Sequence, residues 1–322
     1  MENILILDPG FGSLNKGDEI ISECVHKELY FLTKDKFVLE LSTQLASFDI
    51  TQVMRNMARV NYYSTCRLKF VAGSNLALMN MRHHYPQWNV NILNYKPYKG
   101  CIFVGVGVGE DEKSNRYTTN LYKKMLNHDY YHSVRDERSK RYIESLGLKA
   151  INTGCATMWM LTPDFCKTIP TKKAPNVVFT LNEYENDSRE QQFIDILKSH
   201  YEHLYFWPQG VNDYEYLHRY KNIEDITIVP ATKDAYDEIL KREDIEYVGT
   251  RLHAGIYAMR HAKRSIIIII DERARDINES NNLNCIEKNK LEDLGQMIES
   301  EFETNIIMPF DEIKRWKAQF NL

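Results

Sequence analysis

The chain contains 322 residues, of which 43% are hydrophobic and 27% are charged. These fractions are typical of globular proteins and exclude a disordered chain, and a length above about 300 residues favours two domains over one. The 41 basic and 45 acidic residues are spread along the sequence, so nucleic acid is not expected as a partner. Any anion site must therefore be local.

The cysteine and histidine patterns indicate neither a metal site nor a disulfide framework. Six cysteines are scattered without a Cys-x-x-Cys pair, as expected of reduced thiols. Two histidine pairs, His128 with His132 and His200 with His203, lack a carboxylate in a recognised ligand pattern, and we interpret all four as surface residues. We expect no bound metal and no cofactor.

Neither a signal peptide nor a membrane span is expected. The first residues, Met1–Leu7, are too few and too acidic for a signal peptide and are typical of a buried first strand. The longest apolar run, Ile266–Ile270, is far shorter than the roughly 20 residues of a membrane helix. These features predict a cytoplasmic protein.

Short apolar runs recur along the first half, each followed by a polar or glycine-containing loop and a helical pattern. This order is typical of consecutive βα units and predicts a parallel sheet. Strands are predicted at Asn3–Leu7, Phe37–Leu41, Lys69–Val71, Cys101–Gly105, Tyr131–Val134 and Ala150–Asn152. A helix is predicted over Glu19–Leu29.

The stretch Leu161–Pro175 holds three prolines and no apolar periodicity, and we interpret it as a linker. The same pattern then starts again, with a helix predicted over Ala231–Lys241 and the isoleucine run predicted to be a strand covered on both faces. Strands of this half are predicted at Asn176–Leu181, His203–Trp207, Ile226–Val229, Ile245–Val248 and Ser265–Ile270.

The fold class predicted is therefore α/β with parallel sheets. We expect an N-terminal Rossmann-like domain over residues 1–165 and a C-terminal Rossmann-like domain over residues 166–309. Residues 310–322 carry apolar side chains at helical spacing, and we predict a helix that packs back on the first domain.

The loop after the first strand, Asp8–Glu19, is the first candidate for ligand binding. Ligands of open parallel sheets bind beyond the carboxyl ends of the strands, and this loop combines three glycines with Asn15, Asp18 and Glu19. It lacks the spacing of a phosphate-binding or dinucleotide loop, and its carboxylates would repel phosphate, so a polyhydroxylated ligand suits it better. Alternatively, Asp18 only caps a helix and the glycines only turn the chain.

The second candidate is the segment Val248–Ile256, in which a strand ends and a helix begins. A helix start beside Arg251 and His253 is suited to an anion, because unpaired N–H groups add to a planar guanidinium. The alternative is a surface arginine and a capping histidine. After the next strand, Arg273 could converge on the same place, whereas we expect Arg275 to pair with neighbouring carboxylates.

Three ordered segments resemble the landmarks of the polysaccharide pyruvyl transferases. They are Asn15–Glu19, Ser133–Asp136 and Gly249–Ala254, and their order and separation match the family across most of the chain. The resemblance implies a GT-B-like fold, in which two Rossmann-like domains face a central cleft, with the acceptor on the N-terminal side and the donor on the C-terminal side.

The resemblance also implies a reaction. Phosphoenolpyruvate would be the donor substrate, and a sugar of a surface polysaccharide, such as an exopolysaccharide or capsule, or of its lipid-linked precursor would be the acceptor. The product would be a pyruvate ketal on two hydroxyls, with phosphate released. A lipid-linked acceptor would bring the enzyme to the inner membrane surface, and a homo-oligomer is left open.

Roles follow residue by residue from the resemblance. Arg251 would hold phosphate or carboxylate, His253 would act as acid or base or only bind phosphate, and Asp18 or Glu19 would orient or deprotonate the acceptor hydroxyl. The donor-binding residues expected are Gly249, Thr250, Arg251, Leu252, His253 and Arg273. The acceptor-binding residues expected are Asn15, Asp18, Glu19, Asn75 and Gln209.

Two other functions remain open at this point. A GT-B glycosyltransferase could place the diphosphate of a nucleotide sugar at the same arginine and helix start. A non-catalytic carbohydrate-binding or assembly protein is the third reading, against which the joint presence of Arg251 and His253 speaks.

Overall fold

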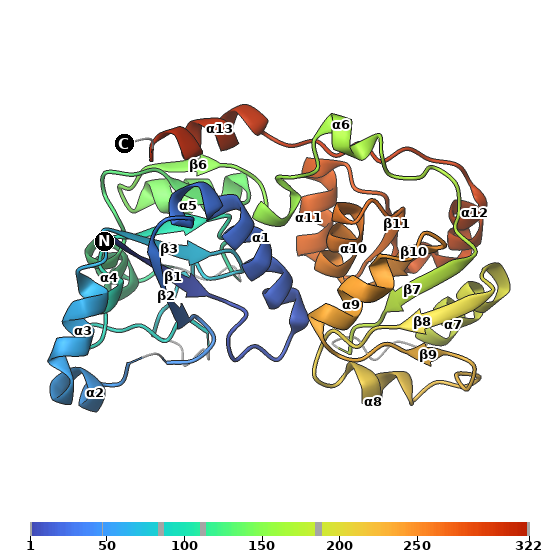
Figure 1. Ribbon diagram of the computed structural model, residues 1–322, viewed down its shortest axis with the longest axis horizontal. Helices are drawn as coiled ribbons and strands as arrows, with labels where there is room; N and C mark the ends of the chain where they lie inside the picture. Colours follow the sequence, from blue (N-terminus) through green and yellow to red (C-terminus); the bar gives the residue numbers. More distant parts are fainter. Residues whose placement is uncertain (1, 47, 83–86, 110–113, 184–188, 321–322) are drawn as a thin grey trace. The chain divides into compact units, whose positions relative to one another are not determined.

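The computed structural model describes residues 2–46, 48–82, 87–109, 114–183 and 189–320, with the backbone alone for Ile50, Glu272 and Arg273. The chain divides into two compact units, each with a parallel sheet and a hydrophobic core of its own (Figure 1). Unit 1 comprises Met1–Ser13, Ile21–Trp159 and Pro309–Leu322, and unit 2 comprises Leu14–Ile20 and Met160–Met308.

Unit 1 is built on a four-stranded parallel sheet of order β2-β1-β3-β4, accompanied by a parallel pair, β5 and β6. The strands are β1 (Asn3–Asp8), β2 (Phe37–Ser42), β3 (Leu68–Ala72), β4 (Cys101–Val104), β5 (His132–Val134) and β6 (Ala150–Asn152). The helices are α1 (Lys16–Thr33), α2 (Ile50–Arg55), α3 (Met57–Ser64), α4 (Arg116–Met125), α5 (Glu137–Ser145), η1 (Lys96–Tyr98) and η2 (Ala156–Met158). Because β1 is central, its residues Ile4–Leu7 are all buried.

The C-terminal helix α13 (Phe310–Ala318) belongs to unit 1. Its Trp316 is fully buried, donates its indole N–H to the carbonyl of Tyr131 at 2.8 Å, and packs edge-on against Phe70 and Trp159. The aromatic packing ties α13 to strand β3 and to the residue after η2, and the hydrogen bond ties it to the residue before β5.

Unit 2 holds a six-stranded parallel sheet of order β12-β11-β10-β7-β8-β9. Its strands are β7 (Asn176–Thr180), β8 (His203–Phe206), β9 (Thr227–Ile228), β10 (Ile245–Gly249), β11 (Ser265–Ile269) and β12 (Cys285–Glu287). The helices are α6 (Pro163–Cys166), α7 (Arg189–His200), α8 (Asp213–Leu217), α9 (Lys233–Leu240), α10 (Leu252–Arg260), α11 (Glu272–Asn281), η3 (Lys288–Asp293) and α12 (Leu294–Glu299).

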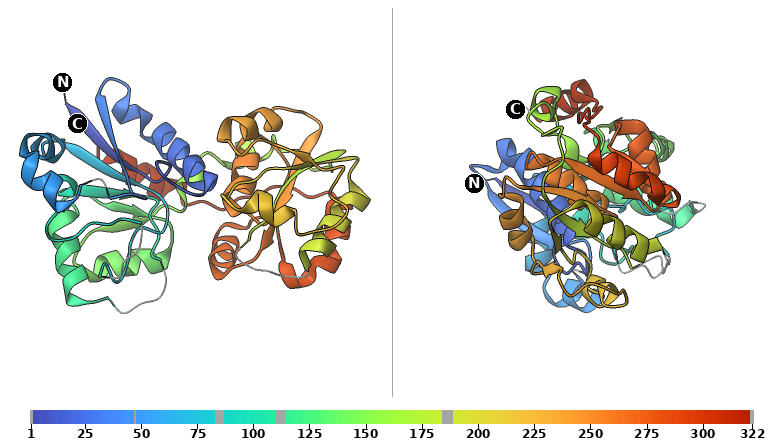
Figure 2. Two further views of the ribbon diagram at one scale, coloured as in Figure 1. Left: turned by 90° about the horizontal axis from the view of Figure 1, so that it is seen from below. Right: turned by 90° about the vertical axis from the view of Figure 1, so that its right-hand side faces the viewer.

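The isoleucine run explains how this sheet is covered on both faces (Figures 1 and 2). Ile266 and Ile268 of β11 belong to the core formed with α7 and α12. Ile267 points to the opposite face, where its side chain closely approaches Gly255 of α10. Alternate residues of one strand therefore meet helices on opposite sides, which requires an unbroken apolar run.

One expectation needs correction, and one strand was missed. His132, interpreted as a surface residue, is fully buried in β5 and bridges to β4, because the N–H of Phe103 donates to its Nδ1 at 3.1 Å. Strand β12 was not predicted, because it has three residues and only Ile286 among them is buried.

In the described part of the chain, no helix combines the length and the apolar character that a bilayer crossing requires.

Candidate functional site

The segment between β10 and α10 is held by a buried hydrogen-bond chain. Tyr247 donates to the carbonyl of Arg251 at 2.9 Å, and its hydroxyl also bonds Thr180 Oγ1 at 2.7 Å, which in turn accepts from the N–H of Arg251 at 3.2 Å. Burial raises the pKa of Tyr247, so its phenol keeps the proton that it donates. A Cβ on Gly249 would lie 2.5 Å from Thr180 Oγ1, so this close approach requires glycine.

Arg251 is buried, and its side chain supports the neighbouring loop. Its Nε donates to the carbonyl of Leu181 at 3.0 Å, and its Nη2 pairs with Asp213, the first residue of α8. Asp213 is fully buried and its Oδ2 accepts the N–H groups of Gln209 at 3.1 Å and Gly210 at 2.7 Å. The guanidinium and the carboxylate balance each other's charge and together fix the turn at residues 209–210.

Gln209 connects this turn to the start of α1. Its Nε2 donates to Oδ1 of Asn15 at 2.8 Å, and the same oxygen accepts the N–H of Gly17 at 2.8 Å. Asn15 is therefore the residue whose side chain caps α1. The backbone of Lys16 also donates to the carbonyl of Gln209 at 2.8 Å. Oε1 of Gln209 is buried and accepts no hydrogen bond from the described residues, which leaves an acceptor for a ligand hydroxyl.

Two carboxylates stand in the first turn of α1. Asp18 and Glu19 are both half-buried in the first turn of the helix. Glu19 forms an ion pair with Lys16, and the backbone N–H of Asp18 donates to the carbonyl of Asn15 at 3.1 Å. Residues Leu14–Ile20 belong to unit 2, so the predicted segment Asn15–Glu19 shares a compact unit with Gln209 and Arg251.

The remaining predicted residues are placed as follows. Thr250 is buried before α10, Leu252 is its buried first residue, and His253 is its half-buried second residue. Asn75 lies in unit 1 after β3, and its Oδ1 is buried without a hydrogen bond from the described residues. The side chain of Arg273 lies outside the described part of the structure. Arg275 pairs with a carboxylate, as predicted, but the partner is Glu287 of β12.

Sequence reasoning missed Asp213 and Thr180, and it placed Gly210 in a loop that could contact ligand without foreseeing its contact with Arg251. A Cβ on Gly210 would lie 2.5 Å from Arg251 Nη2 and 2.9 Å from Asp213 Oδ1, so the glycine permits the ion pair. The Gly210-Val211-Asn212-Asp213 order signals a turn, but nothing in the sequence connects Asp213 with an arginine of a later strand end.

Solved structures identify the architecture as GT-B-like. The UDP-GlcNAc 2-epimerase of Methanocaldococcus jannaschii, in complex with UDP-GlcNAc and UDP, matches with a TM-score of 0.54 at 12% identity over 99% of both chains. S. aureus MnaA with UDP gives a TM-score of 0.56 at 9% identity over 98% of this chain and 95% of its own. The UDP-GlcNAc 2-epimerase of Neisseria meningitidis gives 0.51 at 10% identity over 99% of both chains. At these identities the likeness defines the fold alone.

The family follows from a separate comparison. The family model described as polysaccharide pyruvyl transferase matches residues 15–272, and the chain belongs to this family. The matched range begins at Asn15, which caps α1, and includes the whole of α10. A comparison with curated proteins found no match.

Proposed function

We propose that this protein transfers the pyruvyl group of phosphoenolpyruvate to two hydroxyls of a sugar in a surface polysaccharide or its lipid-linked precursor, releasing phosphate. The observation that carries the proposal is membership of the polysaccharide pyruvyl transferase family over residues 15–272. This range includes both predicted ligand segments, Asn15–Glu19 and Gly249–His253, which lie in one compact unit.

The donor phosphate is assigned to the start of α10. The first N–H groups of a helix have no partner within it, and His253 stands among them as the second residue. The charge of Arg251 is balanced by Asp213. We therefore assign Arg251 a positioning role, in which it holds the loop at residues 209–213 through Asp213. Gly249 ends β10 and Thr250 follows it, directly before Arg251.

The acceptor sugar is assigned to the start of α1. Oε1 of Gln209 provides a buried acceptor for a sugar hydroxyl, held by the bond from Nε2 to Asn15. We assign the base that receives the hydroxyl proton to Asp18, which is half-buried in the first turn of α1.

The reaction then balances in two steps. Proton transfer from His253 to the methylene carbon of phosphoenolpyruvate makes C2 electrophilic, and a sugar hydroxyl adds to C2 as its proton passes to Asp18. The second hydroxyl then displaces phosphate from C2, which closes the cyclic ketal. The proton of this hydroxyl passes to the departing phosphate or to the base. Preorganised N–H groups at α10 stabilise the departing phosphate.

The test measures phosphate released from phosphoenolpyruvate by purified protein supplied with a panel of lipid-linked or aryl glycosides. We expect acceptor-dependent release, and a loss of about 10²–10⁴-fold in kcat/KM for His253→Gln or Asp18→Asn. His203→Gln is the matched control, because His203 is exposed at the amino end of β8, the opposite edge of the sheet from α10.

Two results would overturn the proposal. One is phosphate release that is unchanged in His253→Gln and Asp18→Asn. The other is stabilisation by a nucleotide sugar together with no response to phosphoenolpyruvate in a thermal-shift series, which would favour glycosyl transfer instead.

A further inference from the structure

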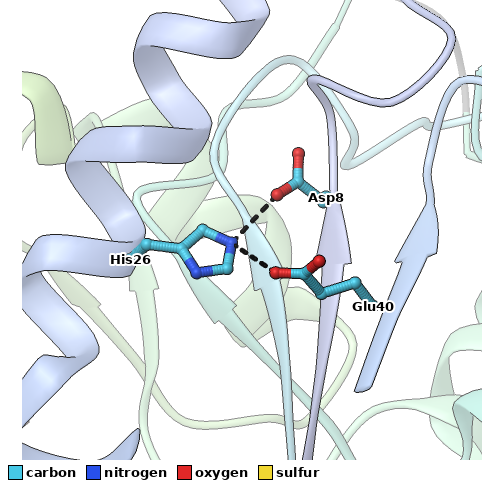
Figure 3. Close-up of side chains that lie close together, drawn as sticks. All are labelled: Asp8, His26 and Glu40. Carbon is cyan, nitrogen blue, oxygen red and sulfur yellow. Dashed lines mark hydrogen bonds and ion pairs between the residues drawn. The ribbon is translucent and has the colours of Figure 1, made fainter. Parts of the chain in front are cut away.

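Unit 1 contains a second group of chemically active side chains, separate from the site described above. Asp8 is the last residue of β1, Glu40 lies in the neighbouring edge strand β2, and His26 comes from α1 (Figure 3). The imidazole points between the two carboxylates. Its Nε2 lies 3.0 Å from Oδ2 of Asp8 and 3.4 Å from Oε1 of Glu40.

These separations are those of ligands around one cation. One nitrogen and two carboxylate oxygens of the three residues all lie within 4.8 Å of one another. Ligand bonds of about 2.1 Å place neighbouring ligand atoms about 3.0 Å apart at a right angle and about 3.4 Å apart at a tetrahedral angle. The distances from Nε2 to the two oxygens therefore already match those of ligands around one cation, and the two oxygens lie within 4.8 Å of each other.

The first carboxylate is held in place by groups that would remain behind a bound ion. Asp8 is buried, its Oδ1 accepts the N–H of Gly10 at 2.6 Å, and its Oδ2 accepts the hydroxyl of Ser22. Burial opposes ionisation of Asp8, but the hydrogen bonds from His26, Ser22 and Gly10 outweigh it and lower its pKa. An orienting shell of this kind is typical of metal ligands.

The other two side chains leave the group open to entry. The side chain of His26 is 31% exposed and that of Glu40 is 38% exposed, so a hydrated cation can reach these two ligands from solvent, whereas the side chain of Asp8 is 4% exposed and lies behind them. Two carboxylates and a neutral imidazole carry two negative charges, which a dication neutralises. Without a metal, the proton on Nε2 takes its place between the two carboxylates.

We propose that His26 Nε2, Asp8 Oδ2 and a carboxylate oxygen of Glu40 bind one divalent transition-metal cation, for which zinc is the probe. One imidazole with two carboxylates suits zinc, cobalt or manganese, whereas magnesium and calcium prefer oxygen ligands alone. Binding releases the Nε2 proton to solvent. The ion joins β1, β2 and α1, and so braces the strand end from which the loop at residues 9–15 departs.

The experiment titrates zinc into the full chain after treatment with a chelator and desalting. Calorimetry is expected to give one ion per chain, with a rise of several degrees in melting temperature, and cobalt is expected to give visible absorption bands. His26→Gln should abolish these effects, and magnesium should not reproduce them. Glu40→Gln should weaken the affinity for zinc by about tenfold or more.

Controls separate this site from adventitious binding and from misfolding. His128→Gln, at an exposed histidine of the same unit, should keep the wild-type stoichiometry. Glu40 is on an edge strand and partly exposed, so its variant keeps the test valid if His26→Gln does not fold. No zinc uptake by the wild type, or uptake unchanged in both variants, overturns the proposal. None of these three readouts involves pyruvyl transfer, so the two proposals fail independently.

Discussion

At the scale of single residues, the buried pair of Arg251 and Asp213 governs the site of unit 2. Two charges removed from water are tolerated because each satisfies the other and because both also bond to the backbone. Losing one partner leaves the other charge buried and uncompensated. The pair therefore acts through the geometry of Gln209 and Gly210, which it holds in place.

Asp213→Asn tests this role with little change in shape. The variant keeps a side-chain oxygen for the N–H groups of Gln209 and Gly210 but removes the charge opposite Arg251. We expect a loss of about 3–5 kcal/mol in the free energy of unfolding, measured by urea denaturation. Asp276→Asn, at an exposed carboxylate of α11, serves as the control and should stay within about 0.5 kcal/mol of the wild type.

Gly210→Ala tests the same pair from the backbone side. The added methyl would lie 2.5 Å from Arg251 Nη2, inside a buried contact that cannot move freely. We expect a loss of about 1–3 kcal/mol by urea denaturation. Gly109→Ala is the matched control, because among the described residues its Cβ would meet no atom nearer than 3.6 Å. Equal stability of the two variants would contradict the assigned contact.

At the scale of elements, His132 joins β4 to β5 as a neutral side chain. Its Nδ1 accepts from the N–H of Phe103, so its Nε2 carries the proton and donates to the carbonyl of Asn127 at 2.9 Å. Complete burial disfavours the charged ring and lowers the pKa of His132 to about 4. A second proton would break the bond from Phe103.

This arrangement predicts acid sensitivity of unit 1. The unfolded chain binds the proton near the ordinary pKa of 6.5, whereas the folded chain resists it to about 4. The stability that His132 contributes is therefore complete above pH 6.5 and is lost as pH falls toward 4, at up to about 1.4 kcal/mol per pH unit. His132→Gln can keep both hydrogen bonds, and urea unfolding between pH 7 and 4.5 should show a shallower decline than in the wild type.

At the scale of the whole molecule, the chain crosses between its units more than once. Residues 14–20 and 309–322 each belong to a different unit from the segments beside them. Each unit nevertheless has its own apolar core. A substitution in one core should therefore act mainly on the sheet that surrounds it.

Trp316→Ala tests this separation. Removing the buried indole from α13 should cost about 3–5 kcal/mol in unit 1. Hydrogen exchange followed by mass spectrometry should show faster exchange in β1, β3 and β4, with β7, β10 and β11 unchanged. Faster exchange in both sheets would mean that the two cores unfold together. Ile307→Ala, at an exposed side chain close to α13 in sequence, is the control.

The hydrophobic pattern of the sequence predicted the fold class and most of the strands. Runs such as Asn3–Leu7 and the isoleucines of β11 are local signals, because a strand buried on both faces must be apolar throughout. Strand β12 was not predicted, because a three-residue strand is too short to show a periodicity. His132 was misplaced because burial of a polar ring depends on partners from β4 and the loop at Asn127.

Some features of the candidate site could likewise be predicted from the sequence, and others only from the tertiary structure. The sequence by itself indicated the family, through the resemblance carried by Asn15–Glu19, Ser133–Asp136 and Gly249–Ala254, and the family model over residues 15–272 confirms it. Only the tertiary structure decided that Asn15 bonds Gln209, that Asp213 faces Arg251, and that His26 meets Asp8 and Glu40. The physical reason is that hydrogen bonds and ion pairs form between atoms close in space, whose separation along the chain the fold alone sets.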